Sequence, residues 1–249
     1  MYLIDLERKN ILLTGCDGGL GQAMLKLLTE ANARVLLTDI VKPEKSIRYL
    51  QDLQKEVYWY QCDLADPEAV KEMFERIESE AGSIDILINN AGIRKDALLV
   101  KMTVDDWDAV IDTNLKGPFL CTQASVRMML KHKTSNGKII SVSSLAGIFG
   151  NAGQTNYAAT KAGLIAMTKT WAKEYGKRGM TFNIVAPGLI ESPMTKGLPE
   201  KDIQRLKDAI PLGVPGTPAD VAKVVLFLCS DLSDYVNGEV IRVDGGAVI

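Results

Sequence analysis

Seven short apolar segments, separated by longer amphipathic ones, constrain the fold of this chain more than any other feature. The segments are rich in Val, Ile and Leu with little polar alternation, which is typical of strands covered on both faces. They are Asn10–Thr14, Arg34–Asp39, Val57–Asp63, Ile84–Asn89, Lys138–Ser143, Thr181–Val185 and Val240–Val243. Strands that alternate with helices predict an α/β fold, a doubly wound (Rossmann-type) seven-stranded parallel sheet with helices on both faces.

Several of the intervening segments begin with residues that cap helices. Asp66 precedes Pro67, which places a capping carboxylate before a residue suited to the first helical position. Thr217 and Asp220 stand three apart, the spacing of a reciprocal cap at a helix start. Two longer helices are expected over Asp106–Lys131 and Gln154–Lys173.

Length and charge limit the kind of protein this is. With 249 residues, 47% hydrophobic and 24% charged, the chain fits one large α/β domain over residues 1–249, with no internal repeat or interdomain linker. A net charge of −2 supplies no basic field for a nucleic acid. The apolar run Val224–Cys229 is far too short to span a membrane, and Met1–Asn10 lacks the apolar stretch of an export signal.

The cysteines argue against a metal centre or a disulfide framework. No Cys-x-x-Cys pair occurs, and His132 is the only histidine. The cysteines are widely separated, at Cys16, Cys62, Cys121 and Cys229. We therefore expect no metal site and a reducing, cytoplasmic location.

A glycine-rich turn, Thr14–Gly21, follows the first expected strand and leads into a helix expected over Leu20–Ala31. A backbone without side chains can approach a pyrophosphate, and the helix N-terminus supplies amide donors and positive potential. A tight structural turn would look similar, and the spacing is not that of the common dinucleotide fingerprint. The residues expected to contact a dinucleotide here are Gly15, Asp17, Gly19, Leu20 and Gly21.

Asp39 ends the second expected strand. In a doubly wound fold an acid there hydrogen-bonds the adenosine ribose and would repel a 2′-phosphate, although a strand-end turn former is the alternative. Gly18 offers no cation for such a phosphate, so NAD(H) is favoured and NADP(H) is the second choice.

Asp63 could equally start a helix, and the amides of Asn89 and Asn90 could brace strands. Further expected cofactor contacts are Ile40, Cys62, Asp63, Leu64, Asn90, Ala91 and Gly92.

Tyr157 and Lys161 stand four apart in a helix-like segment, and Ser144 lies thirteen residues before the tyrosine. Residues at this helical spacing share one face. An ammonium about 4 Å from a phenol would favour the phenolate and lower the pKa of the tyrosine from ~10 towards ~7. A tyrosine of this kind can transfer a proton at neutral pH, and the Ser144 hydroxyl could reach the same substrate oxygen.

The segment from Pro187 to Pro218 is rich in Gly and Pro and interrupts the alternation. An apolar stripe runs through it, formed by Met194, Leu198, Ile203, Leu206 and Ile210. One interpretation is a surface helix that packs on the core. The other is a substrate lid over residues 189–216, because long excursions of this sort often gate active sites.

In this order and spacing the motifs resemble the short-chain dehydrogenase/reductase family, across about residues 8 to 246. Within the family the chain looks most like the 3-oxoacyl-acyl-carrier-protein reductases of fatty-acid synthesis. The resemblance rests on the glycine loop, Asp39, Asn89–Gly92, Asn114, Ser144, Gly150–Tyr157, Lys161, Ala186–Glu191 and Asp244–Gly246.

The resemblance implies roles for particular residues. Tyr157 would protonate the substrate oxygen, Ser144 would hydrogen-bond it, and Lys161 would lower the tyrosine pKa. Asn114 would position a water for a proton relay towards Lys161. The groups that would bind the nicotinamide half of the cofactor are Tyr157, Lys161, Pro187, Gly188, Ile190 and Ser192.

The resemblance also implies a reaction, the NAD(P)H-dependent reduction of a 3-oxoacyl thioester of acyl-carrier protein or CoA to the 3-hydroxyacyl thioester. The departure at Gly18, where many such reductases carry a basic residue, favours NADH. Such reductases dock an acidic carrier protein on two basic residues, for which Arg178 and either Lys131 or Lys133 are candidates; a solvated charge run is the other interpretation of that loop.

Two further functions stay open. One is an NAD-dependent dehydrogenase of a small or cyclic secondary alcohol, and the other is a dinucleotide-binding regulator, since a fold alone does not fix function. The family usually forms dimers or tetramers, so a homotetramer is expected, with the two long helices at an interface.

Overall fold

A seven-stranded sheet, all of whose neighbouring strands run parallel, organises the computed structural model, which describes residues 4–191 and 209–247. The strand order is β3-β2-β1-β4-β5-β6-β7. The strands are β1 (Asn10–Thr14), β2 (Arg34–Asp39), β3 (Tyr58–Gln61), β4 (Ile86–Asn89), β5 (Lys138–Val142), β6 (Thr181–Pro187) and β7 (Val240–Val243). This confirms the predicted doubly wound parallel sheet.

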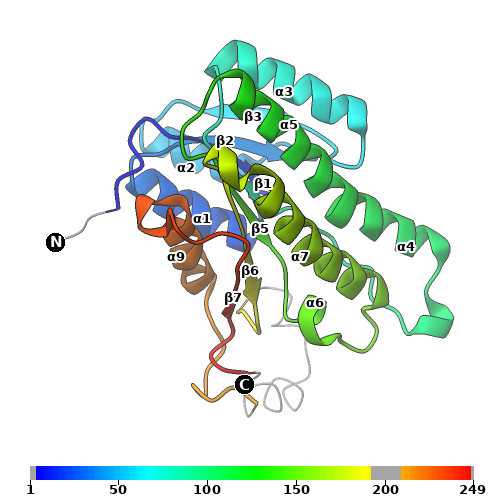
Figure 1. The fold of residues 1–249 in the computed structure, drawn as a ribbon. Coiled ribbons are helices and arrows are strands. Elements are labelled where there is room, and N and C mark those ends of the chain that lie inside the picture. Colours follow the sequence, from blue (N-terminus) through cyan, green and yellow to red (C-terminus); the bar gives the residue numbers. More distant parts are fainter. Residues whose placement is uncertain (1–3, 192–208, 248–249) are drawn as a thin grey trace.

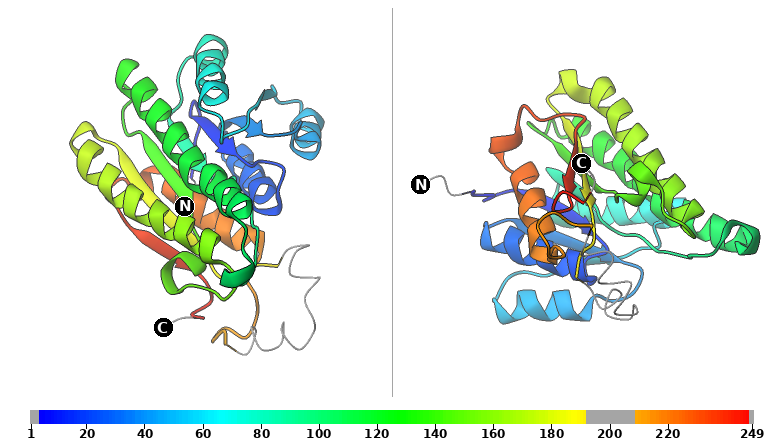
Figure 2. Two further views of the ribbon diagram at one scale, coloured as in Figure 1. Left: turned by 90° about the vertical axis from the view of Figure 1, so that its right-hand side faces the viewer. Right: turned by 90° about the horizontal axis from the view of Figure 1, so that it is seen from below.

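Helices cover both faces of the sheet. They are α1 (Gly19–Glu30), α2 (Glu44–Asp52), α3 (Pro67–Ala81), α4 (Val104–Ile111), α5 (Gly117–Lys131), α6 (Ala146–Phe149), α7 (Thr155–Tyr175) and α9 (Pro218–Cys229). Figure 1 shows α1 and α9 on one side of the sheet and α5 and α7 on the other, and Figure 2 shows α5 and α7 side by side.

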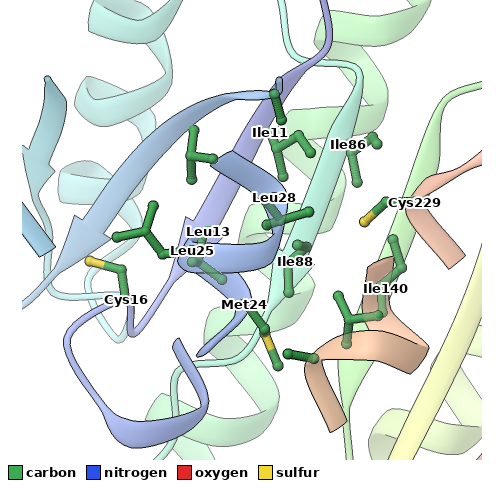
Figure 3. Packing of buried hydrophobic residues seen from close by; sticks show 14 of the residues in the cluster. Ile11, Leu13, Cys16, Met24, Leu25, Leu28, Ile86, Ile88, Ile140 and Cys229 are labelled. Carbon is green, nitrogen blue, oxygen red and sulfur yellow. The ribbon is translucent and has the colours of Figure 1, made fainter. Parts of the chain in front are cut away.

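An apolar layer lies on each face of the sheet, because successive side chains of a strand point to opposite faces. On β1, Ile11 and Leu13 pack with α1, α2 and α9, whereas Leu12 packs with α3 and α5. Figure 3 shows the first layer, where Leu25 and Leu28 of α1 lie against β1 and β4. Each fully buried Leu or Ile contributes about 1.5–3 kcal/mol relative to an exposed one, so both sheet faces must be covered.

The helix starts behave as their capping residues predict. At the start of α3, the Asp66 carboxylate accepts a hydrogen bond from the Glu68 amide at 2.9 Å, and Pro67 is the first residue of the helix. At the start of α9, Thr217 N donates to the Asp220 carboxylate at 2.9 Å and Asp220 N donates to the Thr217 hydroxyl at 3.3 Å. These caps satisfy amides that have no partner inside the helix.

The predicted helix over Asp106–Lys131 is present throughout, but its middle is not α-helical. A π-helical turn, Asp112–Lys116, separates α4 from α5. Pro118 has no amide hydrogen and its ring clashes with the carbonyl four residues earlier, which interrupts a regular α-helix there. The wider turn buries Asn114 completely.

The strand order reverses beside β1, and the carboxyl edge of the sheet at this reversal is called the crevice below. The chain leaves β1 towards β2 on one side, whereas β4 pairs with the other side of β1. Ligands of doubly wound sheets bind at such a reversal, beyond the carboxyl ends of the strands. In the part of the chain that the structure describes, no helix has the length and apolarity needed to cross a membrane.

Candidate active site

The glycine loop is fixed against the segment that follows β4. Gly15 has a φ of +63°, and a Cβ on it would stand 2.7 Å from the Ala91 Cα, so only glycine fits there. The Thr14 hydroxyl accepts hydrogen bonds from the amides of Asn90 and Ala91, each at 3.0 Å. The ends of β1 and β4 are thereby joined at the crevice.

The side-chain amides of Asn89 and Asn90 brace neighbouring parts of the chain. Asn90 Nδ2 donates to the carbonyls of Thr14 at 3.0 Å and Gly15 at 2.9 Å. Asn89 Nδ2 lies in hydrogen-bond contact with the hydroxyls of Thr122 and Ser141. Both side chains therefore have the bracing role that remained open in the sequence.

The start of α1 fits a dinucleotide pyrophosphate. A Cβ on Gly19 would meet nothing within 4 Å, and one on Gly18 would meet only the Gly15 carbonyl, at 3.7 Å. The first intrahelical bond runs from Gln22 N to the Gly18 carbonyl, so the amides before Gln22 precede the helical ladder. Open space over such amides favours an anion.

The Asp39 carboxylate lies at the end of β2, beside the glycine loop. One oxygen accepts from the Ile40 amide at 2.9 Å, and the other lies 3.5 Å from the Asp17 amide. This position fits an adenosine ribose next to the loop. Ile40 is 57% exposed and so lies open beside this corner.

At the end of β3, Asp63 takes part in a local turn. Its carboxylate accepts from the Ala65 amide at 2.9 Å. The cap of α3 is Asp66, so the helix-start interpretation of Asp63 is wrong. Its neighbours Cys62 and Leu64 are buried, and the Cys62 amide donates to the Asp39 carbonyl at 3.0 Å.

Ser144 and Tyr157 come together from different elements. Ser144 follows β5, Tyr157 lies in the first turn of α7, and the serine hydroxyl is near enough to the phenol to lower its pKa. The adjacent Ser143 is 2% exposed and donates to the Lys161 carbonyl at 2.9 Å. Ser143 therefore positions the backbone of α7, and only Ser144 reaches the tyrosine.

Lys161 points into the protein. Its ammonium donates to the Val142 carbonyl at 2.8 Å and lies 5.5 Å from the centroid of the Tyr157 ring. Burial lowers the pKa of Lys161 to about 8. The amine is thus close to the ring face of the tyrosine and stays mostly protonated near neutral pH.

The expected depression of the Tyr157 pKa by Lys161 is wrong for this structure. Burial raises the pKa of Tyr157 above its ordinary value, against the lowering effects of the Ser144 hydrogen bond and the Arg94 charge. Desolvation disfavours the phenolate. The spacing of four places the lysine on the correct face, but its ammonium bonds a backbone carbonyl.

Asn114 clamps the segment after β4 from the π-helical turn. Its Oδ1 accepts from the Ile93 amide and its Nδ2 donates to the Ile93 carbonyl, both at 2.8 Å. A Cβ on Gly92 would lie 3.2 Å from Asn114 Oδ1 and 3.6 Å from Lys161 Nζ. Asn114 and Lys161 therefore flank one small space beside Gly92.

The segments after β6 and β7 close the crevice. The Pro187 carbonyl accepts from the Leu145 amide at 3.1 Å, and the Gly188 amide donates to the Val243 carbonyl at 3.0 Å. Ile190 forms a bridge with Gly216, so the two ends of the expected lid at 189–216 lie together. Ser192 and the stripe residues Met194, Leu198, Ile203 and Leu206 lie outside the described residues.

The candidate carrier-docking residues lie at the amino edge of the sheet, opposite the edge that holds the glycine loop and Tyr157. Lys131 pairs with Glu78 at 2.6 Å, and Lys133 follows at the loop before β5. Arg178 ends the 3₁₀ turn Gly176–Arg178 that precedes β6. At 1.5 Å per residue, Arg178 is roughly 30 Å from Tyr157 along α7.

Residues that hold the catalytic segments together were not predicted. Asn156 Nδ2 donates to the carbonyls of Lys95 at 3.0 Å and Asp106 at 3.2 Å, and Gln154 Nε2 donates to the Asp96 carboxylate at 3.0 Å. The available signal was their position beside Tyr157 at the helix start. Over residues 4–191 and 209–247, no group of three or more His, Cys, Asp or Glu side chains could hold a metal.

Comparison with known proteins gives the same picture over nearly the whole chain. A family model described as enoyl-(acyl carrier protein) reductase matches residues 15–248. The chain is 50% identical to the 3-oxoacyl-(acyl-carrier-protein) reductase FabG of Thermotoga maritima, covering 98% of this chain and 99% of the relative. Identity is 42% to the proteins of the same name from Aquifex aeolicus, over 98% of each chain, and Rickettsia conorii, over 99% of this chain and 100% of the relative.

Proposed function

Because the chain belongs to the short-chain dehydrogenase/reductase family of oxidoreductases, we propose that it reduces a 3-oxoacyl thioester to the 3-hydroxyacyl thioester with a reduced nicotinamide dinucleotide. The observation that carries the proposal is full-length similarity, at 50% identity, to a reductase named for this reaction. The meeting of Ser144, Tyr157 and Lys161 beside a glycine loop suited to a pyrophosphate supports it.

The residues of the site suit a carbonyl reduction. When bound, the nicotinamide supplies the hydride. Tyr157 donates its phenolic proton to the substrate oxygen as negative charge develops there, and the raised pKa keeps that proton in place at neutral pH. Ser144 donates a hydrogen bond to the same oxygen. Lys161 places a cation 5.5 Å from the centroid of the Tyr157 ring, which orients the phenol in the site.

Asn114 holds the segment after β4 in place beside Lys161. It holds Ile93 through two hydrogen bonds and so fixes Gly92, beside which Lys161 stands. The second lone pair of Asn114 Oδ1 suits a water between Asn114 and Lys161, a route for returning a proton to Tyr157.

Asp39 favours NADH as the dinucleotide. Its carboxylate lies where the adenosine ribose meets the end of β2, and a 2′-phosphate there would face a like charge. NADPH is the second choice. The ratio of kcat/KM for the two dinucleotides decides between them.

The carrier protein and the assembly belong to the same proposal. Arg178 with Lys133 is the pair best placed for an acidic carrier, because Lys131 is engaged by Glu78. Exposed apolar side chains on α4 and α5, among them Val104 at 73% and Phe119 at 40%, support a homotetramer built on these helices.

A substrate panel tests the proposed reaction. With NADH, acetoacetyl-CoA is expected to be reduced with a kcat/KM at least about a hundredfold above that of cyclohexanone, because the thioester adds binding energy that a small ketone lacks. Crotonyl-CoA serves as the control for enoyl reduction. Faster turnover of a cyclic alcohol with NAD⁺ would favour the alcohol dehydrogenase instead, and NADH binding without turnover of any carbonyl would favour the regulator.

A further inference from the structure

Gln154, the residue before α7, does not use its side chain to cap that helix. Its Nε2 instead donates to the Asp96 carboxylate at 3.0 Å. Its Oε1 accepts from the Asn151 side-chain amide at 3.0 Å, so both polar atoms of the Gln154 side chain are engaged. Gln154 is 6% exposed, and the buried side chain is therefore held in one place at the start of α7.

The Asp96 carboxylate belongs to a segment of backbone that is bonded to the start of α7 on both sides of it. On one side, the Lys95 carbonyl accepts from the Asn156 side-chain amide at 3.0 Å. On the other, the Ala97 amide donates to the Gly153 carbonyl at 2.9 Å. Because both chain neighbours of Asp96 are fixed, its carboxylate presents a fixed acceptor to the helix start.

This carboxylate lies where the helix itself lacks one. The first turn of α7 contains no acidic residue. A helix N-terminus carries positive potential from its unpaired amides, and a nearby carboxylate stabilises it. Tyr157 lies three residues after Gln154, one helical turn further on. Burial raises the pKa of Tyr157, and the Asp96 charge adds to that rise, which agrees with a carboxylate close to the phenol.

We propose that Gln154 and Asp96 are positioning residues for the proton donor, because their hydrogen bond holds the first turn of α7, and with it the Tyr157 hydroxyl, in line with the substrate oxygen. The inference rests on the proposed function, in which Tyr157 gives its proton to that oxygen. A displacement of about 1 Å at a reacting group costs up to roughly a hundredfold in rate. Both residues act through the helix start rather than on the substrate.

Gln154→Ala tests this role by two measurements. Without substrate, hydrogen–deuterium exchange of the backbone amides of residues 158–164 is expected to speed up about tenfold, because the helix start loses its anchor. In the reduction of acetoacetyl-CoA by NADH, kcat is expected to fall about tenfold, and the ratio of kcat in H2O to kcat in D2O to rise at least about 1.5-fold, because proton donation by a misplaced tyrosine limits the rate. Gln154→Met, which keeps the side-chain volume without the amide, replaces Gln154→Ala if that variant does not fold.

Variants at Asp96 separate the hydrogen bond from the charge. Asp96→Asn keeps an oxygen that accepts from Gln154 Nε2, and is expected to keep the wild-type exchange rate and isotope ratio at pH 7. Asp96→Ala removes the acceptor and is expected to match Gln154→Ala. The double variant should be no slower than either single variant, because both substitutions remove the same bond.

Asn10→Ala is the matched control. Asn10 Nδ2 also ties segments together, through the carbonyls of Ala81 at 3.1 Å and Ser83 at 2.7 Å, but it lies at the amino edge of the sheet. Its loss is expected to lower the melting temperature and to leave the exchange of α7 and the isotope ratio unchanged.

The outcomes distinguish this inference from the proposed reaction. A wild-type chain that reduces no acetoacetyl-CoA would overturn the proposed function, and with it the role of the pair in proton donation. If wild type reduces it but Gln154→Ala keeps the wild-type exchange rate and isotope ratio, only the positioning role is overturned. An Asp96→Asn variant that behaves like Asp96→Ala would assign the effect to the charge and would also overturn that role.

Discussion

Tyr157→Phe is expected to lower kcat for acetoacetyl-CoA reduction about a thousandfold, because a positioned general acid contributes roughly 10²–10⁴ in rate. The phenylalanine keeps the ring that packs near Lys161 but has no proton to give. The Kd of NADH is expected to stay within about threefold of wild type, since the pyrophosphate and ribose contacts are unaffected. Stopped-flow turnover and fluorescence titration measure the two quantities.

The same helix supplies the control for this substitution. Tyr175 ends α7 and packs against Phe182, with ring centroids 6.2 Å apart, far from the crevice. Tyr175→Phe is expected to keep wild-type kcat. If Tyr157→Phe retained more than about a tenth of the wild-type kcat, Tyr157 would not be the proton donor.

Lys161→Met is expected to slow the enzyme and to stabilise the fold. Burial lowers the pKa of Lys161 from 10.5 to about 8, which corresponds to about 3 kcal/mol of unfavourable desolvation at neutral pH. Loss of the bond to the Val142 carbonyl offsets about 1 kcal/mol, which leaves a net gain of about 2 kcal/mol. The melting temperature should therefore rise by roughly 4–8 °C at pH 7 while kcat falls about a hundredfold.

The gain in stability has a defined pH window. The pKa of Lys161 is lower in the folded chain than in the unfolded chain, so the unfolded chain binds more protons between pH 8 and 10.5. The penalty is fully present below about pH 8 and fades as the pH rises towards 10.5. The difference in melting temperature between Lys161→Met and wild type should shrink over that window.

Lys138 provides a buried lysine for comparison. It is 5% exposed and pairs with Asp234 at 2.7 Å. Lys138→Met removes this ion pair and the contact of the ammonium with the Ser233 hydroxyl, while Asn136 still contacts Asp234, and is expected to lower the melting temperature. A Lys161→Met variant that is less stable than wild type at pH 7, as Lys138→Met should be, would contradict the assigned desolvation of Lys161.

The sheet could be predicted from the sequence because buried parallel strands appear as continuous apolar runs. All seven strands were located. The boundaries differ at four of them: Val57 and the residues after Gln61 lie outside β3, residues 84–85 outside β4 and Ser143 outside β5, and β6 extends to Pro187. The π-helical turn at Asp112–Lys116 inside the predicted helix could not be predicted from hydrophobic periodicity, because it inserts one residue without changing composition. That turn is what buries Asn114.

The sequence predicts where the residues of the candidate site lie, but not which groups their side chains contact. Residue spacing placed Ser144, Tyr157 and Lys161 together, since strand ends and helix starts meet at one edge of the sheet. Spacing did not show that the Lys161 ammonium bonds Val142, so the direction of the Tyr157 pKa shift was predicted wrongly. The Asp17 carboxylate accepts from the Ser46 amide at 2.8 Å, a tertiary bond between residues without any shared motif.

The fate of a labelled hydride tests the central claim most directly. Acetoacetyl-CoA is incubated with NADH that carries deuterium on the transferred position, and the product is analysed by mass spectrometry and NMR. The account predicts 3-hydroxybutyryl-CoA with one deuterium on the carbinol carbon and a solvent proton on its oxygen, formed by wild type and about a thousandfold more slowly by Tyr157→Phe. Product without deuterium on that carbon, or equal rates for the two proteins, would contradict it.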